Sequence, residues 1–528
     1  MSNHAYESAA ALRPSSNGPI PISTLCERFS LAPASAEDAA VLNDLSILGV
    51  SVDSADTAPG ELFVGLPGFT VHGARFAADA VASGAVAVLT DADGAQIVHQ
   101  TAPGTPVLVH SDPRAVVGPL SAEVYHHPAR GLVTTAVTGT NGKTTTAYFL
   151  DAILSAHVGG CMVAGTVELR VGERSVESPR TTVEAPVLQR MMALAVEDKV
   201  GAASLEASSH AIVLHRLDGI VVDVAGFTNL QRDHLDFHKT MEGYLEAKAQ
   251  LFTPEHARRG VVCVDDQWGA ALAAEAPIEI DRVRAYPGET PADWWVSDAA
   301  VSLTDSATTF TLHGPDGEKI EASCPLPGLV NVQNAALALV MAIRAGVPAA
   351  TAAAALAGAH NIPGRMQRIS QRDGRRGLCI VDFAHTPDAM ELALKAVRPI
   401  TPGRLIVVFG SDGDRDQGKR PMLGEVCARL ADVLVVTDEN PRSEDPQLIR
   451  NAILEGVRGV RPDLKDVEEI TTWRGDAVRR GVELCGPDDT VIVTGKGHEP
   501  FLEMAGEFIR YNDAPVMAEA VEEKWGRA

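Results

Sequence analysis

Residues 133–146 constrain the possible folds of this chain more than any other segment, because they read V-T-T-A-V-T-G-T-N-G-K-T-T-T. The β-branched run predicts a strand, the glycines predict a tight turn, and the apolar residues 147–154 are compatible with a helix. Glycines let backbone N–H groups approach an anion, and the N-terminus of a helix adds its dipole. The segment therefore predicts an α/β domain with a phosphate-binding loop.

The side chains of this loop fit a nucleoside triphosphate and its magnesium ion. Lys143 supplies a charge for the outer phosphates, and Thr144 offers a hydroxyl to Mg²⁺. The usual pattern has a further glycine five residues before the Gly-Lys pair, where this chain has Val137, so the loop is a shortened G-x-x-G-K-T form. A chance glycine-rich turn is the alternative, but the order of strand, loop and helix favours an ATP-dependent enzyme. The predicted ATP-binding residues of the loop are Gly139, Thr140, Asn141, Gly142, Lys143, Thr144 and Thr145.

The composition is that of a multidomain globular protein and excludes several classes of function. A length of 528 residues predicts about three domains, and a formal net charge of −24 argues against a general binder of nucleic acid or anionic membranes. The seven cysteines include no C-x-x-C pair, which favours reduced, buried thiols over a disulfide framework or a zinc site. No segment has the roughly 18 apolar residues of a membrane span, and the N-terminus lacks a signal-peptide pattern. We therefore expect a soluble, cytoplasmic protein.

Changes in composition divide the chain into a leader and three domains. Residues 1–20 include the run P-S-S-N-G-P and are expected to form a flexible leader without a structural role. Strand-like runs alternate with helical ones over residues 21–130, and the strand before the phosphate loop opens a second domain, residues 131–361. An alanine-rich stretch over residues 335–359 predicts paired helices, and N-I-P-G then marks the third domain, residues 362–528. The predicted fold class is α/β, with a small N-terminal α/β domain, a mostly parallel sheet in the central domain and a Rossmann-like C-terminal domain.

Four apolar strands of the third domain are each followed by a polar cluster. The predicted strands are residues 380–381, 405–409, 433–436 and 491–493, and the polar clusters include D-F-A-H and E-N-P-R. Ligands of open parallel sheets bind outside the carboxyl ends of the strands. Four clusters at this position therefore predict one shared ligand site.

Further motifs extend along most of the chain. They are L-E-A-S-S-H at 205–210, T-N-L-Q-R-D-H-L-D at 228–236, Y-L-E-A-K at 244–248, N-V-Q-N-A-A at 331–336, I-P-G-R-M-Q at 362–367, D-F-A-H-T-P-D-A at 382–389, G-D-R-D-Q-G-K-R-P at 413–421, E-N-P-R at 439–442 and G-K-G-H-E at 495–499. Together with the phosphate loop, this ordered set resembles the Mur ligases of bacterial peptidoglycan synthesis, and among them the UDP-N-acetylmuramoyl-tripeptide synthetases. The resemblance runs from about residue 50 to the C-terminus.

The resemblance implies ATP-dependent formation of an amide. Enzymes of this type phosphorylate the D-Glu carboxylate of UDP-MurNAc-L-Ala-D-Glu, and the amine of a diamino acid then attacks the acyl phosphate. The implied catalytic residues are Lys143, Glu206, His234 and Lys248, and the implied Mg²⁺ ligands are Thr144, Glu206, His234 and Lys248. Lys248 would serve as a carbamate, since carbamylation turns an ammonium into a carboxylate-like ligand suited to a hard cation. Without the other motifs, Lys248 would be interpreted as a surface lysine on a helix.

Matching motif positions imply the contacts with the two larger substrates. Beyond the phosphate loop, the residues assigned to ATP are Asn331, Asn334, Arg365 and Asp382. By the same resemblance, Arg365 and Asp382 would reach back from the C-terminal domain, so domain closure would assemble the site and exclude water. The residues assigned to the UDP-MurNAc-dipeptide are Val52, Ser54, Thr181, Thr182, Ser208 and Arg216.

The incoming amino acid is assigned to the polar clusters of the third domain. The implied residues are Arg415, Glu439, Asn440, Pro441, Arg442, Gly495 and Glu499. Because meso-diaminopimelate has two carboxylates and two ammonium groups, arginines must pair with the former and a carboxylate with the latter. A substrate without the distal carboxylate would leave Arg442 as an unpaired buried charge, which favours diaminopimelate. If Arg442 is instead exposed on a turn, L-lysine and L-ornithine remain alternatives.

Three other functions are alternatives to this one. A folylpolyglutamate synthase-like ligase would not be expected to carry the N-terminal Asp53-Ser54 segment or the segment 439–442. A non-catalytic ATP-binding regulator is disfavoured because Lys143, Glu206, His234 and Lys248 are all retained. A motor or transporter is disfavoured because no second hydrolysis motif of that kind is evident. We expect the enzyme to be a monomer.

Overall fold

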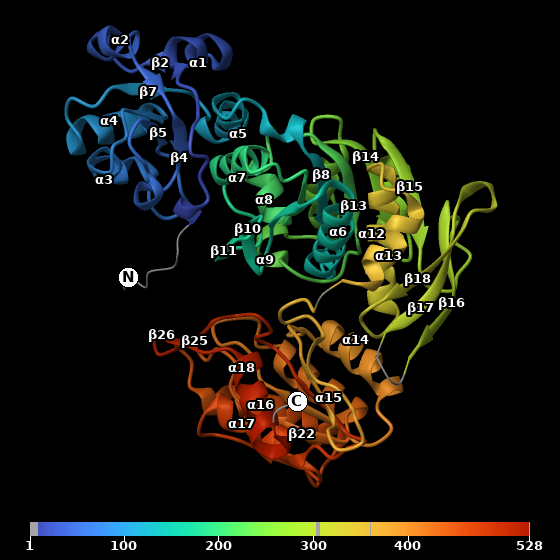
Figure 1. The fold of residues 1–528 in the computed structure, drawn as a ribbon. Helices are drawn as coiled ribbons and strands as arrows, with labels where there is room; N and C mark the ends of the chain where they lie inside the picture. Colours follow the sequence, from blue (N-terminus) through green and yellow to red (C-terminus); the bar gives the residue numbers. More distant parts are fainter. Residues whose placement is uncertain (1–8, 303–306, 360, 527–528) are drawn as a thin grey trace. The chain divides into compact units, whose positions relative to one another are not determined.

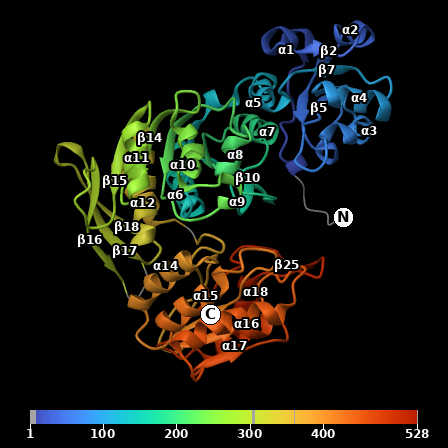
Figure 2. The same cartoon turned by 180° about the vertical axis from the view of Figure 1, so that it is seen from behind.

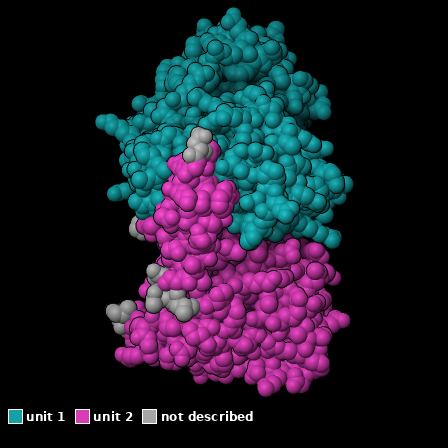
Figure 3. All heavy atoms as spheres, turned by 90° about the vertical axis from the view of Figure 1, so that its right-hand side faces the viewer, with its two compact units in different colours: residues 1–294, 336–355 teal, residues 295–335, 356–528 magenta. Residues whose placement is uncertain are grey.

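A computed structural model of the chain describes residues 9–302, 307–359 and 361–526. The chain forms two compact units, one of residues 1–294 and 336–355 and the other of residues 295–335 and 356–528 (Figure 3). Residues 1–8 of the expected leader lie outside the described part of the chain. Both units are built from parallel strands and helices, so the predicted α/β fold class is confirmed.

The N-terminal part of the first unit is a five-stranded sheet with the order β2-β7-β6-β5-β4 (Figure 1). Strands β4 to β7 are parallel, and the short edge strand β2 is antiparallel to β7. Every residue of β5 and β6 is buried, which is typical of parallel strands covered on both faces. Helices α3 and α4 lie beside this sheet in both views (Figures 1 and 2). The elements are β1 Ile20–Pro21, α1 Ile22–Phe29, β2 Ala32–Pro33, α2 Ala36–Leu42, β3 Ser46–Ile47, β4 Gly49–Ser51, β5 Glu61–Val64, α3 Ala77–Ala82, β6 Ala87–Thr90, α4 Ala92–Thr101, β7 Val107–Val109 and α5 Pro113–Val124.

The larger sheet of the first unit has the strand order β11-β10-β9-β12-β8-β13-β14-β15. Strands β9, β12, β8, β13, β14 and β15 are parallel, so their carboxyl ends share one edge of the sheet. The phosphate loop follows β8, which lies between β12 and β13 in the middle of this edge. The elements are β8 Val133–Thr138, α6 Lys143–Val158, β9 Cys161–Ala164, β10 Glu168–Val171, β11 Arg174–Glu177, α7 Ala185–Glu197, β12 Ala202–Glu206, α8 Ser209–Val213, β13 Val222–Phe227, α9 Leu235–His238, α10 Met241–Ala249, β14 Ala257–Cys263, α11 Gln267–Glu275 and β15 Glu279–Arg284.

A three-stranded antiparallel segment and two helices follow in the chain. The strands are β16 Trp294–Val301, β17 Thr308–His313 and β18 Lys319–Cys324, and the helices are α12 Leu329–Arg344 and α13 Ala349–Ala357. The alanine-rich stretch therefore forms helices, as its composition predicts. Helix α12 begins six residues earlier than the predicted start at Ala335, because the apolar residues before it continue the helical pattern.

The C-terminal sheet in the second unit has the order β19-β20-β24-β21-β22-β23. All four predicted strands are present as β20 Leu378–Val381, β21 Leu405–Phe409, β22 Val433–Val436 and β24 Thr490–Val493, and they are parallel neighbours. Their carboxyl ends therefore bring the four polar clusters to one edge. The remaining elements are β19 Gln367–Ser370, α14 Pro387–Val397, α15 Lys419–Leu430, α16 Pro446–Val460, β23 Val467–Glu469, α17 Arg474–Leu484, β25 Phe501–Met504, β26 Glu507–Arg510 and α18 Asp513–Trp525.

The described part of the expected leader is bound to the first unit, so the expectation of a segment without a structural role is wrong from residue 9 onward. The side chain of Leu12 is buried. The guanidinium of Arg190, on α7, donates to the carbonyls of Ala9 at 2.7 Å and Leu12 at 3.2 Å, and forms an ion pair with Asp56 at 2.9 Å. The polar run after Leu12 predicted flexibility, but one apolar side chain and two carbonyls anchor the segment that precedes it.

Two further expectations concern the state of the cysteines and the presence of a membrane-spanning helix. All seven cysteines are free thiols, and six of them are buried, as expected for small apolar side chains. Over the described residues, no helix combines the length and the apolar character needed to cross a membrane.

Candidate active site

The phosphate loop connects β8 to α6, as the sequence predicts. Gly139 (φ 144°) and Gly142 (φ 92°) have conformations that glycine adopts readily, and a Cβ on Gly139 would lie 1.9 Å from Oγ1 of Thr228. Lys143 begins α6, and its ammonium donates to the carbonyls of Gly139 and Thr140 at 2.9 Å each. Glycines, a lysine and a helix N-terminus are thus combined in the arrangement that binds phosphate.

Residues 228–231, directly after β13, support the phosphate loop. Oδ1 of Asn229 accepts a hydrogen bond from the backbone of Asn141 at 3.1 Å, and its Nδ2 donates to the carbonyl of Asn141 at 3.0 Å. The backbone N–H of Gln231 donates to Oγ1 of Thr140 at 2.9 Å. The sequence motifs alone implied no individual role for these side chains. Their position directly after an apolar strand was the signal that could have identified them.

The carboxylate of Glu206 ends β12 and contacts two threonines. Its Oε2 accepts hydrogen bonds from the hydroxyls of Thr144 and Thr166 at 2.9 Å each, and its Oε1 accepts from the backbone N–H of Thr166 at 2.8 Å. Thr144 and Thr145 are buried in the first turn of α6. Thr166, which the sequence analysis did not select, comes shortly after β9, so the same strand-end signal applies to it. The structure therefore brings together Thr144 and Glu206, two of the predicted Mg²⁺ ligands.

Lys248 lies on α10 with only 1% of its surface exposed, so it is not a surface lysine. Its Nζ donates to the carbonyl of Gly139 at 2.8 Å and lies 4.4 Å from the centre of the Tyr244 ring. Burial, followed by the nearby ammonium of Lys143, holds the pKa of Lys248 well below its usual value. The phosphate loop is therefore in contact with a buried lysine whose pKa is lowered.

His234 lies beside these lysines, immediately before α9. Its ring forms an edge contact with His210 at a centroid distance of 4.9 Å, and its Nε2 lies 3.5 Å from the carboxylate of Asp233. Burial lowers the pKa of His234, and the charges of Lys143 and Lys248 lower it further. A neutral imidazole is the form that binds a metal ion.

The donor chemistry of this region can be compared with the needs of Mg²⁺. Within the described ranges, no group of three or more His, Cys, Asp or Glu side chains is placed to hold a metal ion. The predicted set contains only two residues of those types, Glu206 and His234, and adds the hydroxyl of Thr144 and the modified side chain of Lys248. Glu206 and Thr144 supply hard oxygen atoms in contact with the phosphate loop, which fits Mg²⁺.

Four residues assigned to the UDP-MurNAc-dipeptide lie next to Glu206. Oγ1 of Thr182 donates to the carbonyl of Glu206 at 2.7 Å and accepts from the backbone N–H of Ser208 at 3.0 Å. The guanidinium of Arg216 donates to the carbonyl of Thr182 at 3.1 Å. Thr181 accepts a hydrogen bond at 3.2 Å from the hydroxyl of Thr166, which also contacts Glu206. Thr181, Thr182, Ser208 and Arg216 thus form one polar group beside the phosphate loop.

Val52 and Ser54, assigned to the same substrate, lie in the N-terminal sheet region directly after β4. Val52 is partly buried against the apolar core of that region, and Ser54 begins a short 3-10 helix. The side chain of Asp53 caps this turn by accepting from the N–H of Ala55 at 3.0 Å. The segment therefore has a fixed local conformation.

The four residues assigned to ATP outside the phosphate loop belong to the second unit. Asn331 and Asn334 are buried on α12, where Nδ2 of Asn331 donates to the carbonyl of Pro327 at 2.8 Å. Both oxygens of Asp382 accept backbone hydrogen bonds, from Met366 at 2.8 Å and Ala384 at 2.9 Å. The guanidinium of Arg365 lies 4.3 Å from the centre of the Phe383 ring. Arg365 and Asp382 therefore share one loop region of the C-terminal sheet.

All residues assigned to the amino acid except Arg415 lie at the carboxyl ends of β22 and β24. Nδ2 of Asn440 donates to Oε2 of Glu499 at 3.1 Å, and a Cβ on Gly495 would lie 2.6 Å from Oε2 of Glu439. Glu439 is 3% exposed, and burial together with the carboxylate of Asp412 raises its pKa to about 8. Pro441 is also buried. The polar segments after β22 and β24 are therefore in contact with each other, while the shared ligand site of all four clusters stays a prediction.

Arg442 lies between two carboxylates that the sequence analysis did not select. Its guanidinium is 3.5 Å from Oδ2 of Asp412 and 3.4 Å from Oε2 of Glu503. Glu503 lies on β25, whose hairpin partner is β26, so no local pattern in the sequence indicates that it approaches Arg442. Arg415, assigned to the same substrate, is exposed on the loop before α15.

Models of known families match three segments of the chain. A Mur ligase family catalytic domain matches residues 46–125, a Mur ligase middle domain matches residues 137–342, and a Mur ligase glutamate ligase domain matches residues 364–497. The chain is 43% identical over 483 residues to a UDP-N-acetylmuramoyl-L-alanyl-D-glutamate–2,6-diaminopimelate ligase of Streptomyces avermitilis, covering 92% of this chain and 94% of that protein. It is 42% identical over 508 residues to a UDP-N-acetylmuramyl-tripeptide synthetase of Leifsonia xyli, covering 95% and 96%.

Comparison with solved structures also finds similarity to Mur ligases. A structure of a UDP-N-acetylmuramoyl-L-alanyl-D-glutamate–2,6-diaminopimelate ligase, 31% identical, has a TM-score of 0.63 and covers 91% of this chain and 96% of its own. The fold is also that of MurF from Acinetobacter baumannii, which is 19% identical, with a TM-score of 0.66 and coverage of 96% and 99%. The chain therefore belongs to the Mur ligase family of ATP-dependent ligases.

Proposed function

We propose that this chain uses ATP to join meso-2,6-diaminopimelate to the D-Glu carboxylate of UDP-MurNAc-L-Ala-D-Glu, in the synthesis of a peptidoglycan precursor. Similar ligases are named for these two substrates, UDP-N-acetylmuramoyl-L-alanyl-D-glutamate and 2,6-diaminopimelate. The observation that carries the proposal is the contact of Glu206 with Thr144 beside a phosphate loop that also binds Lys143 and Lys248. Acidic and basic groups around one loop suit transfer of a phosphoryl group, because that reaction depends on positioning and on neutralisation of charge.

In the first step, transfer of a phosphoryl group from ATP, the residues around the phosphate loop have different roles. Backbone N–H groups of the loop and the ammonium of Lys143 bind the phosphates of ATP. Thr144 and Glu206 would hold Mg²⁺, with His234 and Lys248 as ligands of a second ion, and bound Mg²⁺ would neutralise charge on the phosphates. The amine of Lys248 must be neutral to accept CO₂ and become a carbamate, and its lowered pKa favours that state.

The dipeptide substrate is the acceptor of the phosphoryl group. Thr182 contacts Glu206, and Ser208 and Arg216 contact Thr182, so with Thr181 they can hold the D-Glu end of that substrate close to the phosphate loop. Val52 and Ser54 would bind its uridine end. Asn331, Asn334, Arg365 and Asp382 would complete the ATP site.

The diamino acid is the nucleophile of the second step, and its amine attacks the acyl phosphate. Glu499 would bind an ammonium group, Glu439 would line the same site, and Arg442, with Arg415 and Asn440, would bind carboxylates. A second candidate substrate, L-lysine or L-ornithine, is favoured by one observation. Asp412 and Glu503 already neutralise Arg442, so a substrate without a distal carboxylate would not leave its charge unpaired.

Phosphate release is the assay that tests the proposal. The enzyme is supplied with ATP, Mg²⁺ and UDP-MurNAc-L-Ala-D-Glu, and meso-diaminopimelate, L-lysine and L-ornithine are compared in parallel. We expect release that depends on the diamino acid and is fastest with diaminopimelate. Release that is fastest with L-lysine would establish the second candidate, and no release with any of the three would refute the function.

The proposed function also assigns one ligand to each of the three predicted domains. The three matched family segments lie inside the ranges 21–130, 131–361 and 362–528, which we propose as the UDP-binding, ATP-binding and amino-acid-binding domains. We also propose that the enzyme acts as a monomer in the cytoplasm, where ATP and nucleotide-linked precursors are available.

A further inference from the structure

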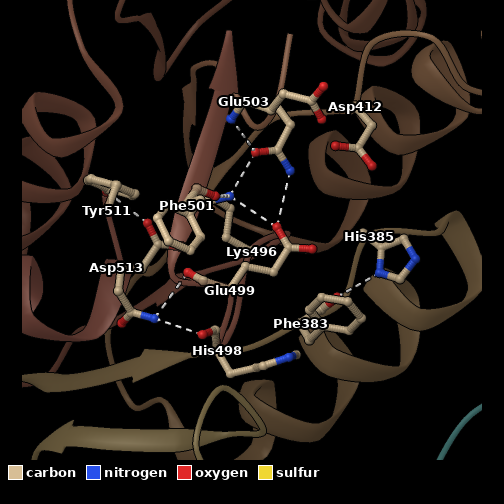
Figure 4. Close-up of polar contacts among 12 residues, drawn as sticks. Phe383, His385, Asp412, Lys496, His498, Glu499, Phe501, Glu503, Tyr511 and Asp513 are labelled. Atoms are coloured by element: carbon tan, nitrogen blue, oxygen red, sulfur yellow. Dashed lines mark hydrogen bonds and ion pairs between the residues drawn. The ribbon is translucent and has the colours of Figure 1, made fainter. Parts of the chain in front are cut away.

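Lys496 is a buried cation that none of the roles above uses. It follows β24 in the G-K-G-H-E motif, and its side chain is 0% exposed. A lysine is almost never fully buried unless its ammonium is paired. Three acceptors surround Nζ: Oδ1 of Asn440 at 2.8 Å, Oε2 of Glu499 at 3.0 Å and the carbonyl of Phe501 at 2.6 Å (Figure 4). An ammonium has three N–H donors, so this set satisfies all of them.

The three acceptors come from two parts of the chain at the edge of the C-terminal sheet. Asn440 lies in the segment after β22, Glu499 in the segment after β24, and Phe501 at the start of β25. The hairpin strand β25 also donates to Asn440, because the backbone N–H of Glu503 lies 3.2 Å from Oδ1. Lys496 therefore connects the segments that carry the proposed amino-acid-binding residues.

These bonds fix the direction of two side chains. Oδ1 of Asn440 accepts from Lys496 and from Glu503, while Nδ2 of Asn440 donates to Glu499, so a rotated amide would place donors against donors. Both hydrogen bonds to the side-chain carboxylate of Glu499 end on Oε2, which leaves Oε1 to accept a further ammonium group. A carboxylate held in one direction binds a ligand without the entropy cost of ordering it first.

The charge of Lys496 also matters because the surrounding groups are acidic. Glu439 is buried, and its pKa is raised by burial first and then by Asp412 and Glu499. Without a cation at position 496, the carboxylate of Glu499 would lose the ammonium that lies 3.0 Å from it. An ionised Glu499 is needed if it is to bind the ammonium of a diamino acid.

We propose that Lys496 is a positioning residue for the diamino acid: its ammonium holds Glu499 and Asn440 in the orientation that binds this substrate. The inference rests on the proposed function, since it concerns the same site. Lys496 acts through these two side chains and does not itself contact ATP or the dipeptide substrate.

The test compares Lys496→Met with the wild-type enzyme. Methionine keeps much of the length of the side chain and removes its charge and its donors. We expect the KM for the diamino acid to rise at least tenfold, while the KM values for ATP and UDP-MurNAc-L-Ala-D-Glu change less than twofold. Lys395→Met is the matched control, because Lys395 lies in the same unit on α14, is exposed and pairs with Glu391 on its own helix; its kinetic constants should equal those of wild type.

A second measurement separates positioning from a general structural role. Hydroxylamine is a small nucleophile that reacts with an acyl phosphate without using the amino-acid site. Phosphate release with hydroxylamine should therefore be the same in Lys496→Met and wild type. A KM for the diamino acid within threefold of wild type, or an equal loss of the hydroxylamine reaction, would overturn the proposal.

Two outcomes keep this inference distinct from the proposed function. If wild type releases no phosphate with any diamino acid, the function itself is refuted and the inference with it. If wild type is active and the variant has an unchanged KM, only the inference is refuted. Should Lys496→Met not fold, Lys496→Gln decides by the same criteria, since glutamine retains a donor group for the buried acceptors.

Discussion

The buried ion pair between Arg474 and Asp513 allows a sharp prediction about stability. Both side chains are 0% exposed, and the guanidinium donates to the two carboxylate oxygens at 2.8 and 2.9 Å. Arg474 also donates to the carbonyls of Asp438 at 2.8 Å and Thr494 at 2.7 Å, the residues that immediately precede Glu439 and Gly495. One guanidinium therefore fixes the ends of β22 and β24 beneath the proposed amino-acid site.

Replacing Arg474 by methionine would leave the carboxylate of Asp513 buried without its cation and two carbonyls without donors. Breaking a buried ion pair in this way costs about 3–5 kcal/mol. At roughly 2–4 °C per kcal/mol for a domain of this size, the unfolding temperature of the C-terminal sheet should fall by roughly 6–20 °C. Tyr511 still donates to Asp513 at 2.8 Å, which favours the lower part of that range.

Calorimetry of the full chain measures this effect, with Arg480→Met as the control on the same helix, α17. Arg480 pairs with Glu468 and Glu483 at the surface, so its loss should cost less than about 1 kcal/mol. The double variant Arg474→Met with Asp513→Leu should recover at least half of the lost stability, since no buried charge remains at this pair. Equal effects of Arg474→Met and Arg480→Met would refute the reasoning.

Three further predictions concern the proposed site. Lys248→Ala should lose activity and regain part of it with formate or acetate, because a carboxylate would replace the proposed carbamate; full activity without the additive would contradict that role. Arg442→Ala should lower the use of diaminopimelate by at least tenfold with little change in ATP binding, measured as kcat/KM with each diamino acid, and an unchanged preference would exclude Arg442 from substrate selection. Because the pKa of Glu439 is raised to about 8 from an unfolded value near 4.3, the folded protein keeps this proton while the unfolded chain loses it, so stability should fall as pH rises between about 4.5 and 8. Glu439→Gln should make that decline, followed by denaturant unfolding at each pH, less steep, and an identical slope in both proteins would show that the pKa is not raised.

The sequence predicted the strands and their polar ends, because alternation between apolar runs and polar clusters is a local signal. Val433–Val436 and Thr490–Val493 are short apolar runs followed by polar residues, and both proved to be parts of one sheet. Their spatial order was not predictable in the same way. Strand β24 lies between β20 and β21 although more than 80 residues separate it from β21 in the chain. Long connections determine that order, and their packing depends on contacts that no local pattern records.

Several residues of the candidate site could not be predicted from the sequence, and the physical reason is the same for each. Lys496, Asp412 and Glu503 are charged residues in loops or a hairpin, and such residues are exposed in most proteins. Their roles depend on partners far away in sequence, such as Asn440, which lies 56 residues before Lys496. Arg13 and Arg190 were missed for the same reason, since each binds Asp56 from a distant part of the chain.

The anchored N-terminal segment has a practical consequence for handling this protein. Arg190 joins three parts of the sequence through one buried guanidinium: residues 9–12, the turn that contains Ser54 and Asp56, and α7. Shortening the chain to begin after residue 12 would strip two acceptors from that guanidinium and uncover the site occupied by Leu12. A shortened chain should therefore keep residues 9–12, since removing them would disturb the turn of Ser54 and Asp56 that is proposed to receive the uridine.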